Sequence, residues 1–263
     1  MMPRTGTEMM RDVIADLRIA ASFVTILPIG SSKLAGDGTI ARATWALPVA
    51  GLMVGLAGAA SYAIASRLGL PSATAALLAL ATTTLITGAL HEDGLADTAD
   101  GLGGGRTRER KLEIMRDSRI GSYGVCALIL SFGLRWSALA AIANPWLVTL
   151  ALCAAHAAAR AGVPAFMSLV PPARPDGLSA SAGAPPGRSV AVAFGLGTLC
   201  LALALGPGKA LVGLVLLSLA GLILARLAIR QIGGQTGDIL GAFEQTGEIL
   251  ILLVSAAFLQ TGG

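Results

Sequence analysis

The sequence predicts an all-α fold, a polytopic integral membrane helical bundle of about six to seven transmembrane helices with an amphipathic N-terminal helix. Hydrophobic residues make up 54% of the chain and charged residues only 13%, with a mean hydropathy of +0.75. Soluble domains carry about 25% charged residues, so this composition excludes that class. Apolar stretches of about 20 residues, the length that crosses a hydrocarbon core, recur along the chain. We therefore expect residues 1–263 to form a single membrane domain.

Six apolar stretches are long enough to cross a membrane, and they lie at residues 45–66, 70–90, 121–143, 146–169, 189–205 and 209–225. A seventh, residues 248–260, is short, and the sequence leaves open whether it spans. Residues 8–27 mix charged and apolar side chains, which favours an amphipathic helix at the membrane interface. Small residues throughout the helices permit close packing, within one chain or between the copies of a homo-oligomer.

Basic residues are distributed unevenly between the two sides of the membrane. If residues 1–44 are cytoplasmic, alternating crossings place three polar loops on the same side, at about 91–120, 171–188 and 226–248. These four segments hold fifteen of the nineteen Lys and Arg residues, as the positive-inside rule predicts. The sequence thus predicts a multi-pass protein of the cell (inner) membrane whose active site faces the cytoplasm. The net charge of +4 follows from this topology, and no nucleic-acid partner is indicated.

Seven of the fifteen Asp and Glu residues fall between positions 91 and 120. Among them, Asp93, Asp97 and Asp100 are spaced at i, i+4 and i+7, which puts them on one side of a helix. Ionised carboxylates about 6 Å apart repel by about 3 kcal/mol at an effective dielectric constant near 20. A divalent cation would relieve this repulsion, and Mg²⁺ fits better than zinc because the donors are oxygens and the chain has only two His. The alternative is a solvated helix face with salt bridges, which is less favoured because no basic residue follows any of the three by four positions.

The polar segment 231–248 is a predicted second wall of the same site. Asp238 and Glu248 lie ten residues apart, close in sequence to Gln235. Four glycines between positions 233 and 241 would let the backbone approach a ligand closely. The linker 171–188 is rich in Pro, Gly, Ala and Ser, and it is either a lid or a connector.

Carboxylates, Gly-rich turns and Arg residues at one membrane face are what a diphosphate-cleaving enzyme needs, with Mg²⁺ held by oxygens and cations on the phosphates. Two further polar residues, His156 and Arg160, lie four positions apart within an apolar stretch. They face either a polar cavity or a carboxylate from another helix. Asp238 and Glu248 are the candidate partners.

Four motifs occur in order, namely FVTILP after the N-terminal helix, HEDGLADTADG, LEIMRDSRIGSYG and, near the C-terminus, GGQTGDILGA. This arrangement resembles the membrane-bound cobalamin synthase family, the adenosylcobinamide-GDP ribazoletransferases, over nearly the whole chain. One local departure is Glu92, which stands where we expect an apolar residue in this family. The aspartates of the motif are intact.

The resemblance implies that the protein joins adenosylcobinamide-GDP to α-ribazole or to its 5′-phosphate. GMP would be released, Mg²⁺ would be required, and the product would be adenosylcobalamin or its 5′-phosphate, a late step of vitamin B12 nucleotide-loop assembly. In this phosphoryl transfer the ribose 3′-hydroxyl attacks the phosphorus next to the cobinamide arm, and catalysis rests on positioning and charge neutralisation. The preferred acceptor stays open, and membrane lipid is the other expected partner.

With this activity in view, we expect Asp93, Asp97 and Asp100 to be catalytic metal ligands and Asp117 to be a fourth ligand. His91 is either the general base or a capping or supporting residue. Arg116 and Arg119 are expected to clamp the diphosphate. The full set of expected substrate-binding residues is Arg116, Ser118, Arg119, Gln235, Asp238 and Glu248.

Two other functions are weighed against this one. A CDP-alcohol phosphotransferase also uses an Asp-rich helix and a divalent metal, but it requires an Asp-Gly-x-x-Ala-Arg motif, and this chain lacks the Ala-Arg. A cation transporter would use buried carboxylates and glycines to form an ion path. Against a transporter, the acidic residues cluster at one face and residues 45–90 contain no carboxylate.

Overall fold

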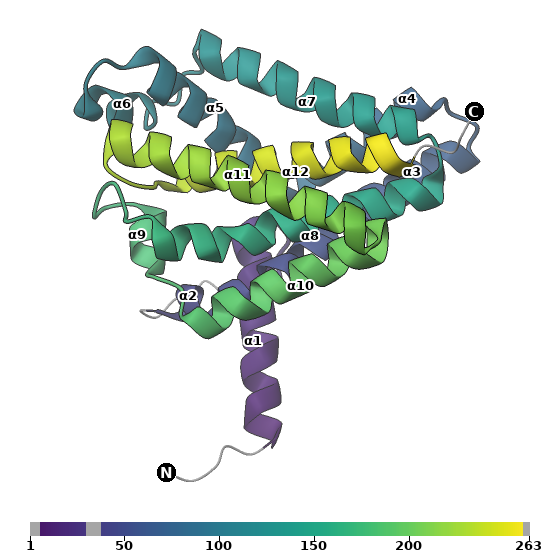
Figure 1. The fold of residues 1–263 in the computed structure, drawn as a ribbon, viewed down its shortest axis with the longest axis horizontal. Coiled ribbons are helices and arrows are strands. Elements are labelled where there is room, and N and C mark those ends of the chain that lie inside the picture. Colours follow the sequence, from purple (N-terminus) through teal and green to yellow (C-terminus); the bar gives the residue numbers. More distant parts are fainter. Residues whose placement is uncertain (1–5, 30–37, 260–263) are drawn as a thin grey trace.

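The computed structural model describes residues 6–29 and 38–259, which form helices joined by short connections (Figure 1). Within these residues no strand forms, and a single isolated bridge pairs Pro172 with Gln235. The helices, in chain order, are α1 (Gly6–Val24), α2 (Thr39–Ala43), the 3-10 turn η1 (Thr44–Ala46), α3 (Leu47–Arg67), α4 (Ser72–Thr87), α5 (Leu90–Gly104), α6 (Arg108–Ile114), α7 (Ser122–Ile142), α8 (Pro145–Leu169), α9 (Leu178–Ala182), α10 (Gly187–Leu205), α11 (Pro207–Ile232) and α12 (Gly237–Leu259).

Six of these helices are long and apolar enough to cross a membrane, which confirms the predicted polytopic helical bundle. They are the continuous stretch Thr39–Arg67 together with α7, α8, α10, α11 and α12. Helices α8 and α12 lie at the centre, with 67% and 61% of their most apolar windows buried, whereas only 17% of α11 is buried. The outer helices therefore present most of their apolar side chains to the surroundings, as lipid-facing helices do.

The stretch 70–90 is not one straight crossing, which corrects the expectation from its hydropathy. Helix α4 ends at Thr87, and α5 leaves it at an angle of 88°. Gly88 and Ala89 both adopt left-handed conformations, with φ of 62° and 57°, and so break the helix. Because α4 has only 16 residues, it is about 24 Å long, shorter than the hydrocarbon core of about 30 Å. The bend directs α5, which carries the acidic motif, against α7 and α12.

The expectation of a loop at residues 226–248 is also wrong. Helix α11 continues to Ile232 and α12 already begins at Gly237, so only four residues connect them. Residues 248–259 of the short segment 248–260 are thus the second half of a 23-residue helix, and residue 260 lies outside the described residues. The polar residues of its first half remain helical because their side chains find buried partners, described below.

Helix α1 runs across the direction of the bundle helices and projects from the bundle (Figure 1). Asp16 ties it to the following segment by accepting hydrogen bonds from Arg42 (3.1 and 3.2 Å) and from the indole N–H of Trp45 (3.0 Å). A helix lies where the sequence predicts one. Its placement at a membrane interface stays a prediction.

The three polar segments expected on one side of the membrane do meet at one end of the bundle. Arg108 donates hydrogen bonds to the carbonyl oxygens of Ile232 (2.8 Å) and Ala173 (2.7 Å). Arg116 forms an ion pair of 2.5 Å with Asp176. These contacts join the chain around α6 to the linker after α8 and to the turn between α11 and α12.

Candidate active site

Helices α5 and α12 cross where two glycines let their backbones touch. A Cβ atom on Gly94 would lie 3.0 Å from the carbonyl oxygen of Asp238 and 3.2 Å from the Cα of Gly241. This close crossing brings Asp93 and Asp97 next to Asp238, near enough for the charges of both Asp93 and Asp238 to act on Asp97. The acidic motif and the C-terminal segment thus form adjacent walls, as the sequence predicts.

The three aspartates of α5 have different surroundings. Asp93 is exposed, Asp97 is half-buried and Asp100 is buried. The Asp100 carboxylate accepts hydrogen bonds from the backbone N–H groups of Gly121 (2.7 Å) and Gly124 (2.9 Å) at the start of α7. A side chain at either glycine would collide with this carboxylate. Asp100 therefore caps the N-terminus of α7, where the helix dipole favours a negative charge.

The charged residues around Asp117 form ion pairs, Asp117 with Arg119 and Arg116 with Asp176. Asp117 accepts hydrogen bonds from the backbone N–H (3.1 Å) and the guanidinium (3.0 and 2.6 Å) of Arg119. These bonds lower the pKa of Asp117 to about 2. Arg116 pairs with Asp176, whose pKa it lowers, while Ser118 is exposed. No geometry in the described residues links Asp117 to the metal-binding role expected of it.

Arg174 is a candidate site residue that the motifs did not single out. Its Nε and Nη1 atoms are buried without a hydrogen-bond partner, and its charge acts on Asp238. The neighbouring backbone is held by hydrogen bonds of 2.8 Å from Gln235 N–H to the Pro171 carbonyl and from Ala173 N–H to the Gln235 carbonyl. The side-chain oxygen of Gln235 is also buried and unpaired. An unpaired guanidinium beside a carboxylate cluster suits an anionic ligand.

A cavity of about 230 Å³ lies beside these groups. His91, Asp93, Arg160 and Asp238 line it together with mainly apolar residues of α1, α3, α8 and α12. His91 is buried, and its Nδ1 has no hydrogen-bond partner, lying 4.0 Å from Glu244 Oε2. The predicted base or supporting residue therefore borders the same space as two of the aspartates.

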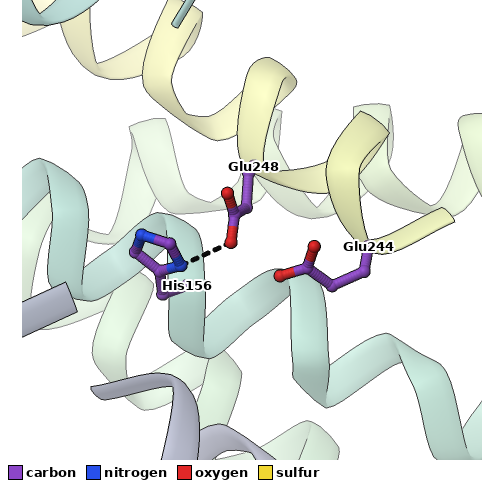
Figure 2. A group of neighbouring side chains, drawn as sticks. All are labelled: His156, Glu244 and Glu248. Atoms are coloured by element: carbon purple, nitrogen blue, oxygen red, sulfur yellow. Dashed lines mark ion pairs between the residues drawn. The ribbon is translucent and has the colours of Figure 1, made fainter. Parts of the chain in front are cut away.

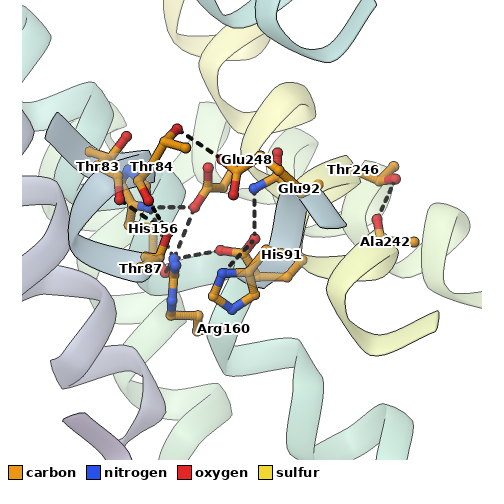
Figure 3. A network of polar contacts seen from close by, with 12 residues as sticks. Thr83, Thr84, Thr87, His91, Glu92, His156, Arg160, Ala242, Thr246 and Glu248 are labelled. Atoms are coloured by element: carbon orange, nitrogen blue, oxygen red, sulfur yellow. Dashed lines mark hydrogen bonds and ion pairs between the residues drawn. The ribbon is translucent and has the colours of Figure 1, made fainter. Parts of the chain in front are cut away.

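A network of buried charges lies inside the bundle and includes Glu92 of the acidic motif (Figure 3). Arg135 of α7 pairs with Glu92 (3.3 Å) and Glu248 (3.1 Å). Arg160 of α8 pairs with Glu248 at 2.9 Å, and His156 contacts the same carboxylate. Glu248 is thus the partner expected for Arg160. The expectation that Glu248 binds substrate is corrected, because both of its oxygens are engaged in the interior.

The pair of Glu92 and Arg135 explains the local departure in the acidic motif. Glu92 stands where an apolar residue is expected, yet it is buried against a cation from another helix. Thr84 adds a hydrogen bond of 3.1 Å to the same carboxylate oxygen. Part of the signal was present in the sequence, because Arg135 lies within an apolar segment and requires a partner there.

Among the described residues, the three side chains whose ligand atoms lie within 4.8 Å of one another are His156, Glu244 and Glu248 (Figure 2). Arg160 already supplies a cation to this group, because its Nη1 lies 2.5 Å from Glu244 and 2.9 Å from Glu248. We therefore assign no metal to it. The aspartates of α5 do not converge this closely, which leaves room for a hydrated cation bound to phosphates.

The sequence matches the family described as cobalamin-5-phosphate synthase over residues 16–256. The chain belongs to the cobalamin-5-phosphate synthase family. A relative from Bradyrhizobium diazoefficiens, named adenosylcobinamide-GDP ribazoletransferase, is 89% identical over 96% of this chain and 97% of its own. Relatives of the same name from Mesorhizobium japonicum and Azorhizobium caulinodans are 49% and 46% identical, over 95% and 92% of this chain and 96% and 95% of their own.

The region matched to the cobalamin-5-phosphate synthase family contains the acidic motif, Arg174 and the buried ion-pair network. Membership decides against the alternatives of a CDP-alcohol phosphotransferase and a cation transporter. No solved structure matches the chain.

Proposed function

We propose that this transferase of cobalamin biosynthesis joins adenosylcobinamide-GDP to α-ribazole or its 5′-phosphate and releases GMP. The names of the relatives supply the two substrates. The observation that carries the proposal is the cluster of Asp93, Asp97 and Asp238 beside the unpaired guanidinium of Arg174. Carboxylates and a free cation are complementary to a metal-bound diphosphate.

The reaction forms one bond from oxygen to phosphorus and breaks another. The 3′-hydroxyl of α-ribazole attacks the phosphorus attached to the cobinamide arm, and the bond to the GMP oxygen breaks. His91 takes the proton of the hydroxyl, since its imidazole lines the cavity. Arg174 holds the diphosphate in line for attack.

The donors at the site suit Mg²⁺, because Asp93, Asp97 and Asp238 offer only carboxylate oxygens. Mg²⁺ keeps several of its waters and binds through one or two carboxylates plus substrate phosphates, so three converging ligands are not required. Bound there, the ion neutralises charge on the diphosphate oxygens. The aspartates would hold it, while Asp100 keeps α5 and α7 in register.

We further place this end of the bundle on the cytoplasmic side of the inner membrane, where Lys and Arg residues concentrate. Membrane lipid surrounds the outer helices, whose large apolar side chains are exposed. The aspartates, Arg174 and the polar linker then open to soluble substrates. The small-molecule partners would reach the site from the cytoplasm.

The test is GMP release by the purified protein in detergent, with adenosylcobinamide-GDP, α-ribazole and Mg²⁺. We expect release that stops on chelation, and a loss of about 100-fold or more in Asp97→Asn, because removing one charge-stabilising group typically costs that much. No GMP above a metal-free control would defeat the proposal. Near-normal activity of Asp97→Asn would remove Asp97 from the site.

A further inference from the structure

The cavity beside His91 is more apolar than the chemistry of phosphoryl transfer requires. Its walls come from helices far apart in the sequence, and the side chains that form them include Phe23, Leu47, Val163, Met167 and Leu240. We propose that this cavity binds the dimethylbenzimidazole base of α-ribazole, an inference that rests on the proposed function.

The dimethylbenzimidazole base is less polar than the guanine, ribose and phosphate groups of the two substrates. Guanine, both riboses and the phosphates carry many hydrogen-bonding or charged groups, and burying these without partners is costly. The dimethylbenzimidazole ring is flat and largely apolar. Ligand sites commonly combine an apolar lining with a few polar groups that fix orientation, which is the composition found here.

The volume of the cavity also favours the dimethylbenzimidazole base as its ligand. At about 230 Å³, the cavity is smaller than the roughly 300–1,000 Å³ of sites for drug-sized ligands. A two-ring base is matched to such a space, whereas a corrin macrocycle or a whole guanine nucleotide is too large. The corrinoid and the GMP group would stay outside the cavity.

Position connects the cavity to the reaction. Its polar groups include His91, Asp93 and Asp238, the residues placed at the reacting end. A base held among the apolar residues would direct its attached ribose toward these groups, and hence its 3′-hydroxyl toward the imidazole. The cavity would then select the acceptor and orient its nucleophile.

A second cavity, of about 560 Å³, provides a control. It lies among α8, α10, α11 and α12, and among its lining residues the charged one is Arg226. Val163 lines the first cavity and Ala165 lines the second, although both belong to α8 and are only two residues apart. The same residue, Phe, can therefore be introduced at either position.

The experiment compares Val163→Phe with Ala165→Phe in the GMP-release assay. In Val163→Phe we expect the KM for α-ribazole to rise at least about tenfold, because a bulky ring occupies the space of the base. The KM for adenosylcobinamide-GDP should stay within about twofold of the wild-type value, and Ala165→Phe should change neither constant. Equal changes for both substrates, or none for α-ribazole, would overturn the inference.

A second measurement uses the unaltered protein and so does not depend on a variant folding. The acceptor carrying benzimidazole without its two methyl groups should have a kcat/KM about tenfold lower than that of α-ribazole, since it lacks the apolar surface that the two methyl groups would bury. Equal kcat/KM values would show that the methyl groups remain in solvent and would overturn the inference. Failure of the wild-type protein to release GMP would overturn the proposed function itself.

Discussion

Asp97 and Asp100 stand three residues apart on α5, and yet their surroundings give them different tasks. Asp100 is buried and accepts two backbone hydrogen bonds from the start of α7. Asp97 is half-buried among like charges from Asp93 and Asp238. The Asp100 carboxylate therefore holds α5 and α7 together. The Asp97 carboxylate lies where repulsion between like charges favours the binding of a cation.

We therefore expect Asp100→Asn to destabilise the protein by about 1–2 kcal/mol, because the carboxamide has one acceptor oxygen and leaves one of the two backbone N–H groups without a partner. Asp97→Asn should leave stability unchanged or raise it slightly, because it removes like-charge repulsion. Thermal unfolding in detergent without Mg²⁺ compares the two variants directly. If both unfold at the same temperature, the capping role assigned to Asp100 is incorrect.

Arg174 and Arg116 provide a second contrast at the residue scale. Arg116 is committed to an exposed ion pair with Asp176, whereas two nitrogens of Arg174 have no protein partner. Arg174→Ala should raise the KM for adenosylcobinamide-GDP by roughly tenfold or more, since hydrogen bonds to charged groups contribute about 1.5–3 kcal/mol. Arg116→Ala serves as the matched control and should have little effect. A raised KM in Arg116→Ala with little change in Arg174→Ala would instead assign diphosphate binding to Arg116.

At the scale of elements, the buried charges join α5, α7, α8 and α12 through a small set of side chains. With both histidines neutral, the two cations Arg135 and Arg160 face the three carboxylates of Glu92, Glu244 and Glu248. The sum is −1. These charges specify which faces of the central helices meet, because any other rotation would bury a charge without a partner.

Removing Arg135 alone changes this sum to −2, and replacing Glu92 as well returns it to −1. Arg135→Leu should therefore destabilise the protein by about 3–5 kcal/mol, while Glu92→Leu with Arg135→Leu should recover a large part of this loss. Thermal unfolding and the yield of folded protein in detergent report the difference. A double variant no more stable than the single one would show that the pairing between these two residues is not what matters.

At the scale of the whole molecule, the two ends of the bundle differ in chemistry. One end gathers the acidic motif, the linker after α8 and the turn between α11 and α12. At the other end, Lys209 donates a hydrogen bond to the carbonyl of Phe258. The uneven distribution of basic residues predicts one orientation of the bundle in the membrane.

Cysteine labelling tests this orientation. In a background with Cys126, Cys153 and Cys200 replaced by Ala, a membrane-impermeant maleimide should label Lys209→Cys on intact cells. It should label Ser118→Cys only after the membrane is permeabilised. The reverse pattern would place the candidate active site outside the cytoplasm.

Much of the fold follows from the sequence, because apolar length and charge asymmetry are properties of the chain itself. The α4–α5 bend could not be predicted, since its two residues, Gly88 and Ala89, read as part of an uninterrupted apolar run. The helical start of α12 could not be predicted either, because polar residues such as Glu244 made this segment look like a loop. Their partners come from distant helices, and only packing reveals that they are buried.

The sequence by itself determined that the protein is a helical membrane bundle, which family it resembles, and that Asp93, Asp97 and Asp238 belong to one polar end. Only the tertiary structure decided that Asp100 caps a helix, that Glu248 pairs with arginines in the interior and that Arg174 is left unpaired. The physical reason is that spacing along a helix fixes which side chains share a face. Whether a charge on that face is free or already neutralised depends on the side chains of other helices.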